Sequence, residues 1–101
     1  PVTAIYVGNY FQALGVLDAL EEARWSVPDR VSVISFDDDR TARFLRPPLS
    51  TIAMAHDEQG EQAMEALLRQ IRGGEPQDVL VVTPPRYIDR GSVAHPPADI
   101  H

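Results

Sequence analysis

Two apolar runs on either side of a helical pattern constrain the fold of this chain more than any other feature. TAIYVG at 3–8 and VSVISF at 31–36 are rich in β-branched residues, which is typical of strands buried on both faces. Between them, leucines recur at helical spacing across about 10–24. A strand, a helix and a strand joined by short links form a βαβ unit with parallel strands and a right-handed crossover. The sequence therefore predicts an α/β fold.

Polar residues follow both predicted strands. Asn9 comes after the first strand and precedes Gln12 by three positions, which is the spacing of a helix capping box. Asp37 opens a run of three aspartates directly after the second strand. Parallel strands of a βαβ unit end at the same edge of the sheet, and open α/β sheets bind ligands at that edge. If the strands are neighbours, Asn9 and Asp37 should therefore emerge roughly 5 Å apart.

The rest of the chain predicts a second helix and several short extended segments. The expected elements are an irregular connection at 40–48, a short strand at 50–55, a helix at about 57–72, a strand at 79–83, a closing edge strand at 86–93 and a flexible tail at 94–101. Continuously apolar strands need cover on both faces of a sheet, and two helices supply little. The chain therefore looks like part of a larger module.

Composition and charge exclude several classes of function. The chain has 101 residues and a formal charge of −6, and all nine of its basic residues are arginine. Scattered arginines on an acidic chain do not form the basic surface that binds a nucleic-acid phosphate backbone, so any contact with DNA would need another segment. No segment is long and apolar enough to cross a membrane, and the start of the chain carries no secretory signal. Cysteine is absent, which fits a cytoplasmic protein without disulfides or thiolate metal sites.

Motifs for catalysis are equally scarce. There is no glycine-rich phosphate loop, no cysteine nucleophile and no serine in a nucleophile elbow, so we expect no enzyme activity and no cofactor. The strongest enzyme alternative is a receiver-like acidic cluster that binds Mg²⁺ for phosphoryl transfer. Three side chains in direct succession cannot all point at one ion, and the other strand end offers only Asn9 and Tyr10. We therefore expect no metal site.

The order of these signals resembles the C-terminal portion of LacI-type (lactose repressor-like) bacterial transcription regulators. The resemblance is carried by TAIYVGNYFQALGVLDALEEARWSVPDRVSVISFDD, PPLSTI and YIDRGSV, and it covers nearly all of residues 2–94. It implies an incomplete Rossmann-like lobe of a periplasmic-binding-protein-like (type I) fold. Residues 1–53 and about 80–93 would belong to the C-terminal lobe, and the helix at 57–72 would cross to the N-terminal lobe.

The function that this resemblance implies is transcription regulation by a repressor-like homodimer. A small-molecule effector, sugar-like or nucleobase-like, would bind in a cleft between the two lobes. It would thereby control DNA binding by an N-terminal headpiece that this chain does not contain. A periplasmic-type solute-binding protein is the alternative within the same fold.

The resemblance also implies ligand-binding residues. Asp37 matches the residue that points into the cleft and accepts hydrogen bonds from the effector, although an aspartate at a strand end can also simply cap a turn. Asn9 can contact a ligand, cap the helix or do both. His56 follows the crossover segment, where family members often line the pocket, but it can equally be a cap or surface residue. Asp38 and Asp39 are expected to serve local turns, neutralised by Arg40 or Arg43.

Three apolar residues match the homodimer interface of the family. Leu14 is an interface candidate that helix packing explains equally well. Phe44 and Leu45 lie in a connection between arginines and prolines, where a role in the core is harder to assign.

Three positions depart from the family pattern. Tyr10 stands where aspartate is usual, Ser35 where glycine is usual and Ser50 where threonine is usual. The tyrosine puts in doubt any ligand contact that depends on a carboxylate at that position.

Overall fold

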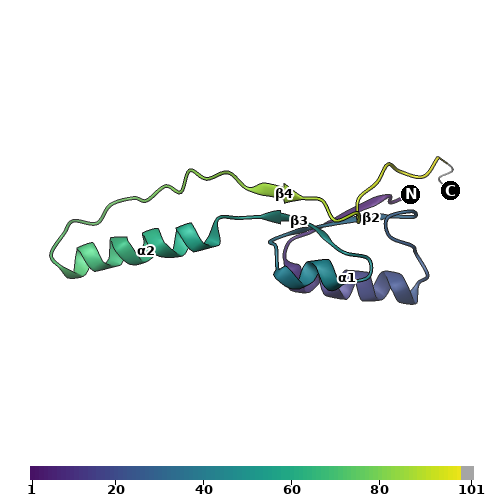
Figure 1. The fold of residues 1–101 in the computed structure, drawn as a ribbon, viewed down its shortest axis with the longest axis horizontal. Coiled ribbons are helices and arrows are strands. Elements are labelled where there is room, and N and C mark those ends of the chain that lie inside the picture. The colour runs from purple at the N-terminus through teal and green to yellow at the C-terminus, as the bar shows by residue number, and fades with distance from the viewer. Residues whose placement is uncertain (99–101) are drawn as a thin grey trace. The chain divides into compact units, whose positions relative to one another are not determined.

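The computed structural model describes residues 1–98, which divide into two units. The first unit combines residues 1–53 with the chain from Arg86 onward, and the second is Met54–Pro85. The first contains β1 (Ala4–Val7), α1 (Tyr10–Glu22), β2 (Ser32–Phe36), a short 3₁₀ helix η1 (Arg40–Phe44), β3 (Ser50–Ala53) and β4 (Arg86–Ile88). The strands form one sheet in the order β1-β2-β3-β4 (Figure 1).

The first three strands are parallel, and β4 pairs antiparallel with β3. The predicted βαβ unit is therefore confirmed, with β1 and β2 as direct neighbours. Asn9 caps α1, since its side-chain Oδ1 accepts the backbone N–H of Gln12 at 2.8 Å.

The hydrophobic core of this unit joins α1 and η1 to the sheet. Its buried members are Val7, Tyr10, Ala13, Leu20, Val31, Val33, Ala42 and Leu49. Register places Val7 beside Ser35 and Ile5 beside Val33 on one face of the sheet. Tyr6 alternates onto the other face, where it is 62% exposed. The prediction that this strand is buried on both faces is therefore wrong for β1, because α1 covers one face.

The chain after β4, from Asp89 to Ala94, is called the closing segment, and it forms hydrogen bonds to β2 and β3. The buried hydroxyl of Ser92 donates to the Val33 carbonyl at 2.6 Å and accepts the Ser50 N–H at 2.8 Å. Ala94 then pairs with Ser32, accepting its hydroxyl at 3.1 Å and donating its own N–H to that oxygen at 2.9 Å. Ala94 is the first residue of the predicted tail, whose last residues, 99–101, lie outside the described part of the chain.

The second unit contains α2 (His56–Ile71), one residue earlier at each end than predicted. Asp57 and Glu58 lie in its first turn and Gly73, with φ of 91°, follows its end. The apolar stripe of the helix is exposed, and it consists of Met64, Leu67, Leu68 and Ile71.

The predicted strand at 79–83 is wrong. This segment is extended but pairs with no strand among the described residues, and Leu80 is 81% exposed. It runs back beside α2, where Thr83 donates a hydrogen bond to Glu58 (Figure 1). An apolar, β-branched run becomes a strand only where another strand can satisfy its backbone groups.

Replacing Ser92 by alanine should destabilise the fold. The substitution removes the hydroxyl shared by Val33 and Ser50 and leaves the buried Ser50 N–H without its acceptor. We expect a loss of about 1–3 kcal/mol in the free energy of unfolding, measured by urea denaturation. Ser26→Ala, at an exposed position, is the matched control and should change stability by less than about 0.5 kcal/mol. Equal effects of the two variants would contradict a bridging role for Ser92.

Candidate functional site

The candidate site lies at the edge of the sheet where β1 and β2 end. Val7 and Ser35 are paired across the two strands, and Asn9 and Asp37 each follow two residues later. The structure thus brings these two of the three predicted ligand residues to the same edge. The Oδ1 of Asn9 is used in capping α1, so one of its two expected roles is confirmed.

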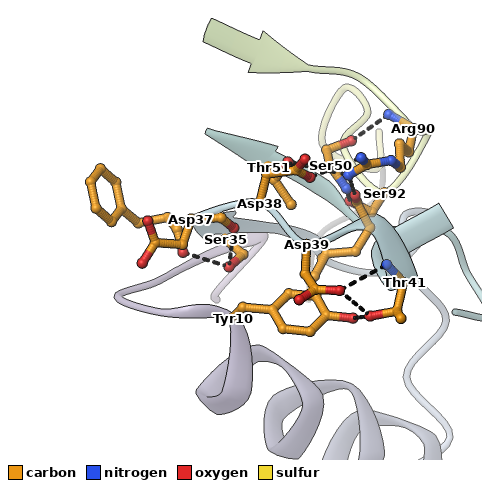
Figure 2. Close-up of polar contacts among 12 residues, drawn as sticks. Tyr10, Ser35, Asp37, Asp38, Asp39, Thr41, Ser50, Thr51, Arg90 and Ser92 are labelled. Carbon is orange, nitrogen blue, oxygen red and sulfur yellow. Dashed lines mark hydrogen bonds and ion pairs between the residues drawn. The ribbon is translucent and has the colours of Figure 1, made fainter. Parts of the chain in front are cut away.

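Asp37 has an unusual backbone conformation. Its φ of 74° lies in the left-handed region, which costs an L residue roughly 1–2 kcal/mol and which aspartate tolerates better than most. The hydroxyl of Ser35 lies beneath this turn and donates to the carbonyls of Phe36 at 2.9 Å and Asp37 at 3.4 Å (Figure 2). Ser35, where the family resemblance implies glycine, therefore holds the peptide groups on both sides of Asp37.

Asp38 is held by residues that are distant in sequence. Its Oδ1 accepts the Thr51 hydroxyl at 2.7 Å and pairs with Nη2 of Arg90 at 2.8 Å (Figure 2). Nη1 of Arg90 also donates to the Leu49 carbonyl at 2.8 Å and to the Thr51 hydroxyl oxygen at 3.2 Å. The expectation of a purely local role for Asp38, neutralised by Arg40 or Arg43, is therefore wrong. The guanidinium that pairs with Asp38 belongs to Arg90 in the closing segment. The two residues are far apart in the sequence, so the sequence alone does not indicate this pair.

Asp39 has the local role that was predicted. It caps η1, accepting from the Thr41 N–H at 2.9 Å and from the Thr41 hydroxyl at 2.6 Å. These hydrogen bonds, with a smaller contribution from Arg40, hold the pKa of the Asp39 carboxyl below its usual value. Because the Thr41 proton goes to Asp39, the hydroxyl of Tyr10 donates to Thr41 Oγ1 at 2.6 Å. Tyr10 thus links α1 to η1.

Comparison with known proteins assigns the chain to a family. The model of the periplasmic binding protein-like domain family matches residues 1–93. The chain belongs to this family.

Relatives within the family are LacI-type transcription regulators, which confirms the resemblance found in the sequence. The chain is 38% identical over 89 residues to the ribose operon repressor of Escherichia coli, covering 88% of this chain and 27% of that protein. It is 39% identical over 95 residues to the HTH-type transcriptional repressor PurR of Salmonella arizonae, covering 94% and 28%. The chain thus spans less than a third of the length of these relatives.

Solved structures agree with this assignment. A LacI family transcriptional regulator from Enterococcus faecium, with bound ribose, superposes with a TM-score of 0.80 at 32% identity, over 91% of this chain and 34% of that one. The mostly parallel α/β sheet is therefore that of the periplasmic-binding-protein-like effector domain of LacI-type regulators, of which this chain is a fragment. Such relatives are regulators rather than enzymes.

The other residues that the family resemblance singled out lie in different surroundings. His56 is the first residue of α2, in the second unit, and is exposed. Leu14 and Leu45 are partly buried against the core, so the difficulty of assigning Leu45 to the core disappears. Phe44 is 63% exposed, with the guanidinium of Arg43 4.7 Å from the centre of its ring. The ligand and interface roles of these residues stay predictions.

A cavity of about 310 Å³ lies away from the aspartates, at the C-terminal end of α1. It is lined by Leu17, Leu20, Glu21, Arg24, Trp25, Ser26, Val27, Arg46 and Pro47. Within residues 1–98, no three histidine, aspartate or glutamate side chains are grouped so that they could hold a metal ion. Within the same range, no helix is long and apolar enough to span a bilayer.

The lowered pKa of Asp39 should depend on Thr41. Thr41→Val removes the hydroxyl bond, so the pKa of Asp39 should rise toward the ordinary aspartate value of about 3.9. NMR titration of the side-chain carboxyl carbon measures this shift directly. Because the pKa is lower in the folded state, the cap stabilises the fold above the unfolded pKa, and this contribution is lost as pH falls through the folded pKa. Thr83→Val, which affects only the second unit, should leave the Asp39 titration unchanged.

Proposed function

We propose that this chain is the effector-sensing and dimerisation part of a cytoplasmic LacI-type transcription regulator. The observation that carries the proposal is the position of Asp37 at the shared carboxyl edge of two parallel strands. Its neighbours Asp38 and Asp39 make structural contacts, and Asp37 is the member of the run that directly follows β2 at this edge. Open α/β sheets bind small molecules at this edge.

The chemistry of Asp37 suits a ligand that presents O–H or N–H donors. A carboxylate in a cleft accepts short, charge-assisted hydrogen bonds from a hydroxyl or a ring N–H. A ligand without such a donor would leave the carboxylate desolvated and unpaired, which costs several-fold in affinity or more. Asn9 is beside it, with an amide that can contact the same ligand. His56 would contribute from the crossover segment.

The effector that we propose is a sugar. Two of the relatives support this class: one is named for the ribose operon and one was solved with bound ribose. A polyhydroxylated ring offers several donors to acceptors such as Asp37 and Asn9. A nucleobase-like effector offers ring N–H donors instead, and it is the alternative that binding measurements can separate.

Regulation would follow from movement between lobes. We propose that α2 packs its exposed stripe of Met64, Leu67, Leu68 and Ile71 against an N-terminal lobe, so that the effector binds between the two lobes. An effector that binds one arrangement of the lobes more tightly shifts the population toward it. A headpiece outside this chain would transmit that shift to operator DNA.

Dimerisation would use the surface formed by Leu14, Phe44 and Leu45. Exposure of the large Phe44 ring supports an interface at η1 and the residue after it. Aromatic rings that become buried when two proteins associate contribute much of the binding free energy of the interface.

Removing the charge of Asp37 should weaken effector binding. With D-ribose as the ligand in isothermal titration of the intact regulator, Asp37→Asn should raise Kd by about ten- to a hundredfold, because a charged acceptor is lost. Asp29→Asn, at an exposed turn before β2, is the control and should leave Kd unchanged.

Two results would change this proposal. Ribose binding that survives Asp37→Asn unaltered would remove Asp37 from the site. Binding of hypoxanthine in place of ribose, abolished by the same substitution, would keep the site and replace the sugar by a nucleobase.

The proposed interface can be tested separately. Phe44→Ser combined with Leu45→Ser should shift the regulator from dimer to monomer in analytical ultracentrifugation, since the apolar contact is replaced by polar groups. Val2→Ser, at an exposed apolar residue outside the proposed interface, is the control. A dimer that persists in the double variant at micromolar concentration would contradict the assignment.

A further inference from the structure

The ion pair between Arg90 and Asp38 lies directly beside the proposed effector residue. Arg90 and Asp38 are 15% and 25% exposed, and Thr51, which contacts both, is fully buried. The guanidinium therefore connects the end of β2 with β3 through bonds that are partly shielded from water. Partly desolvated, multiply bonded pairs of this kind hold their geometry better than exposed ones.

This contact restricts the backbone of Asp37 from its C-terminal side. Phe36 is the last residue of β2 and is fixed by the sheet, while Asp38 is fixed by Thr51 and Arg90. Asp37 lies between these two anchors, and its own carbonyl accepts a hydrogen bond from Ser35. Its φ of 74° would relax toward more favourable values if either anchor were released.

The backbone on both sides of Asp37 is also held by a separate contact. Ser35 is fully buried, and its hydroxyl binds the carbonyls of Phe36 and Asp37. The two contacts differ in their distance along the chain, because Ser35 acts from β2 and Arg90 acts from the closing segment after β4. The residue next to Asp37 is thus held by Arg90, which would not touch the ligand.

We propose that Arg90 is a positioning residue for effector recognition, which fixes the orientation of Asp37 through Asp38 before the ligand arrives. This inference rests on the proposed function of Asp37. Holding a ligand-binding group in its bound geometry in advance lowers the entropy that binding must overcome. Arg90 also places a positive charge within a run of three carboxylates and so reduces their mutual repulsion.

The first test measures the mobility of Asp37 without any ligand. In the intact regulator, the NMR order parameter of the Asp37 amide should fall from about 0.85 to below about 0.6 in Arg90→Met. Arg86→Met removes an exposed arginine of β4 outside this network and should leave the value unchanged. An unchanged order parameter in a folded Arg90→Met protein would overturn the proposal.

Asp38→Asn is a second variant that tests the same contact if Arg90→Met does not fold. It keeps the side-chain shape and an acceptor for Thr51, but it removes the charge that pairs with Arg90. We expect the same direction of change at Asp37, to a smaller extent. In Arg90→Lys the order parameter of the Asp37 amide should lie between those of the wild type and Arg90→Met. A lysine ammonium lacks the planar guanidinium group that bonds Asp38, Thr51 and the Leu49 carbonyl together.

The second test asks whether Arg90 acts on binding through Asp37. With D-ribose as the probe, Arg90→Met should raise Kd about tenfold in the wild-type background and much less in the Asp37→Asn background. Equal effects in both backgrounds would show a merely structural role and contradict the inference. If the wild-type regulator does not bind ribose, the proposed sugar effector fails, while the order parameter still decides the role of Arg90.

Discussion

The hydroxyl of Ser92 joins the two central strands of the first unit. It lies with no exposed surface between β2 and β3, donating to one strand and accepting from the other. Strands of a parallel sheet are usually joined by their own ladder, yet here a residue from the end of the chain completes the bonding. Through that contact the closing segment brings Arg90 against Asp38 and Thr51, so the sheet and the candidate site are completed by the same segment.

The sequence predicted the parts of the fold that depend on local pattern. The strands around α1, the cap formed by Asn9 and the joint edge of Asn9 and Asp37 all follow from periodicity and from the handedness of βαβ units. The strand predicted at 79–83 failed because strand formation needs a partner, which local sequence does not specify. The partner of Asp38 was missed for a similar reason, since nearby arginines were considered and the distant Arg90 was not.

The three departures from the family pattern share a chemical feature. Each introduces or keeps a hydroxyl near the aspartate run, and each hydroxyl is bonded: Tyr10 to Thr41, Ser35 to two carbonyls, and Ser50 to the N–H of Arg90 (Figure 2). Tyr10 stands where the resemblance implies an aspartate, and it contacts η1 through Thr41.

The pairing of β3 with β4 determines how the second unit is attached. The chain leaves the first unit after Ala53 and re-enters it at Arg86, and these two residues are register partners in an antiparallel ladder. Residues 54–85 are therefore an insertion whose two ends emerge side by side from a hydrogen-bonded ribbon. A ribbon of two paired strands bends more readily than its strands slide past each other, because sliding would break the ladder. Both connections of the inserted unit therefore begin at one register pair, and neither is a linker that leaves the first unit alone.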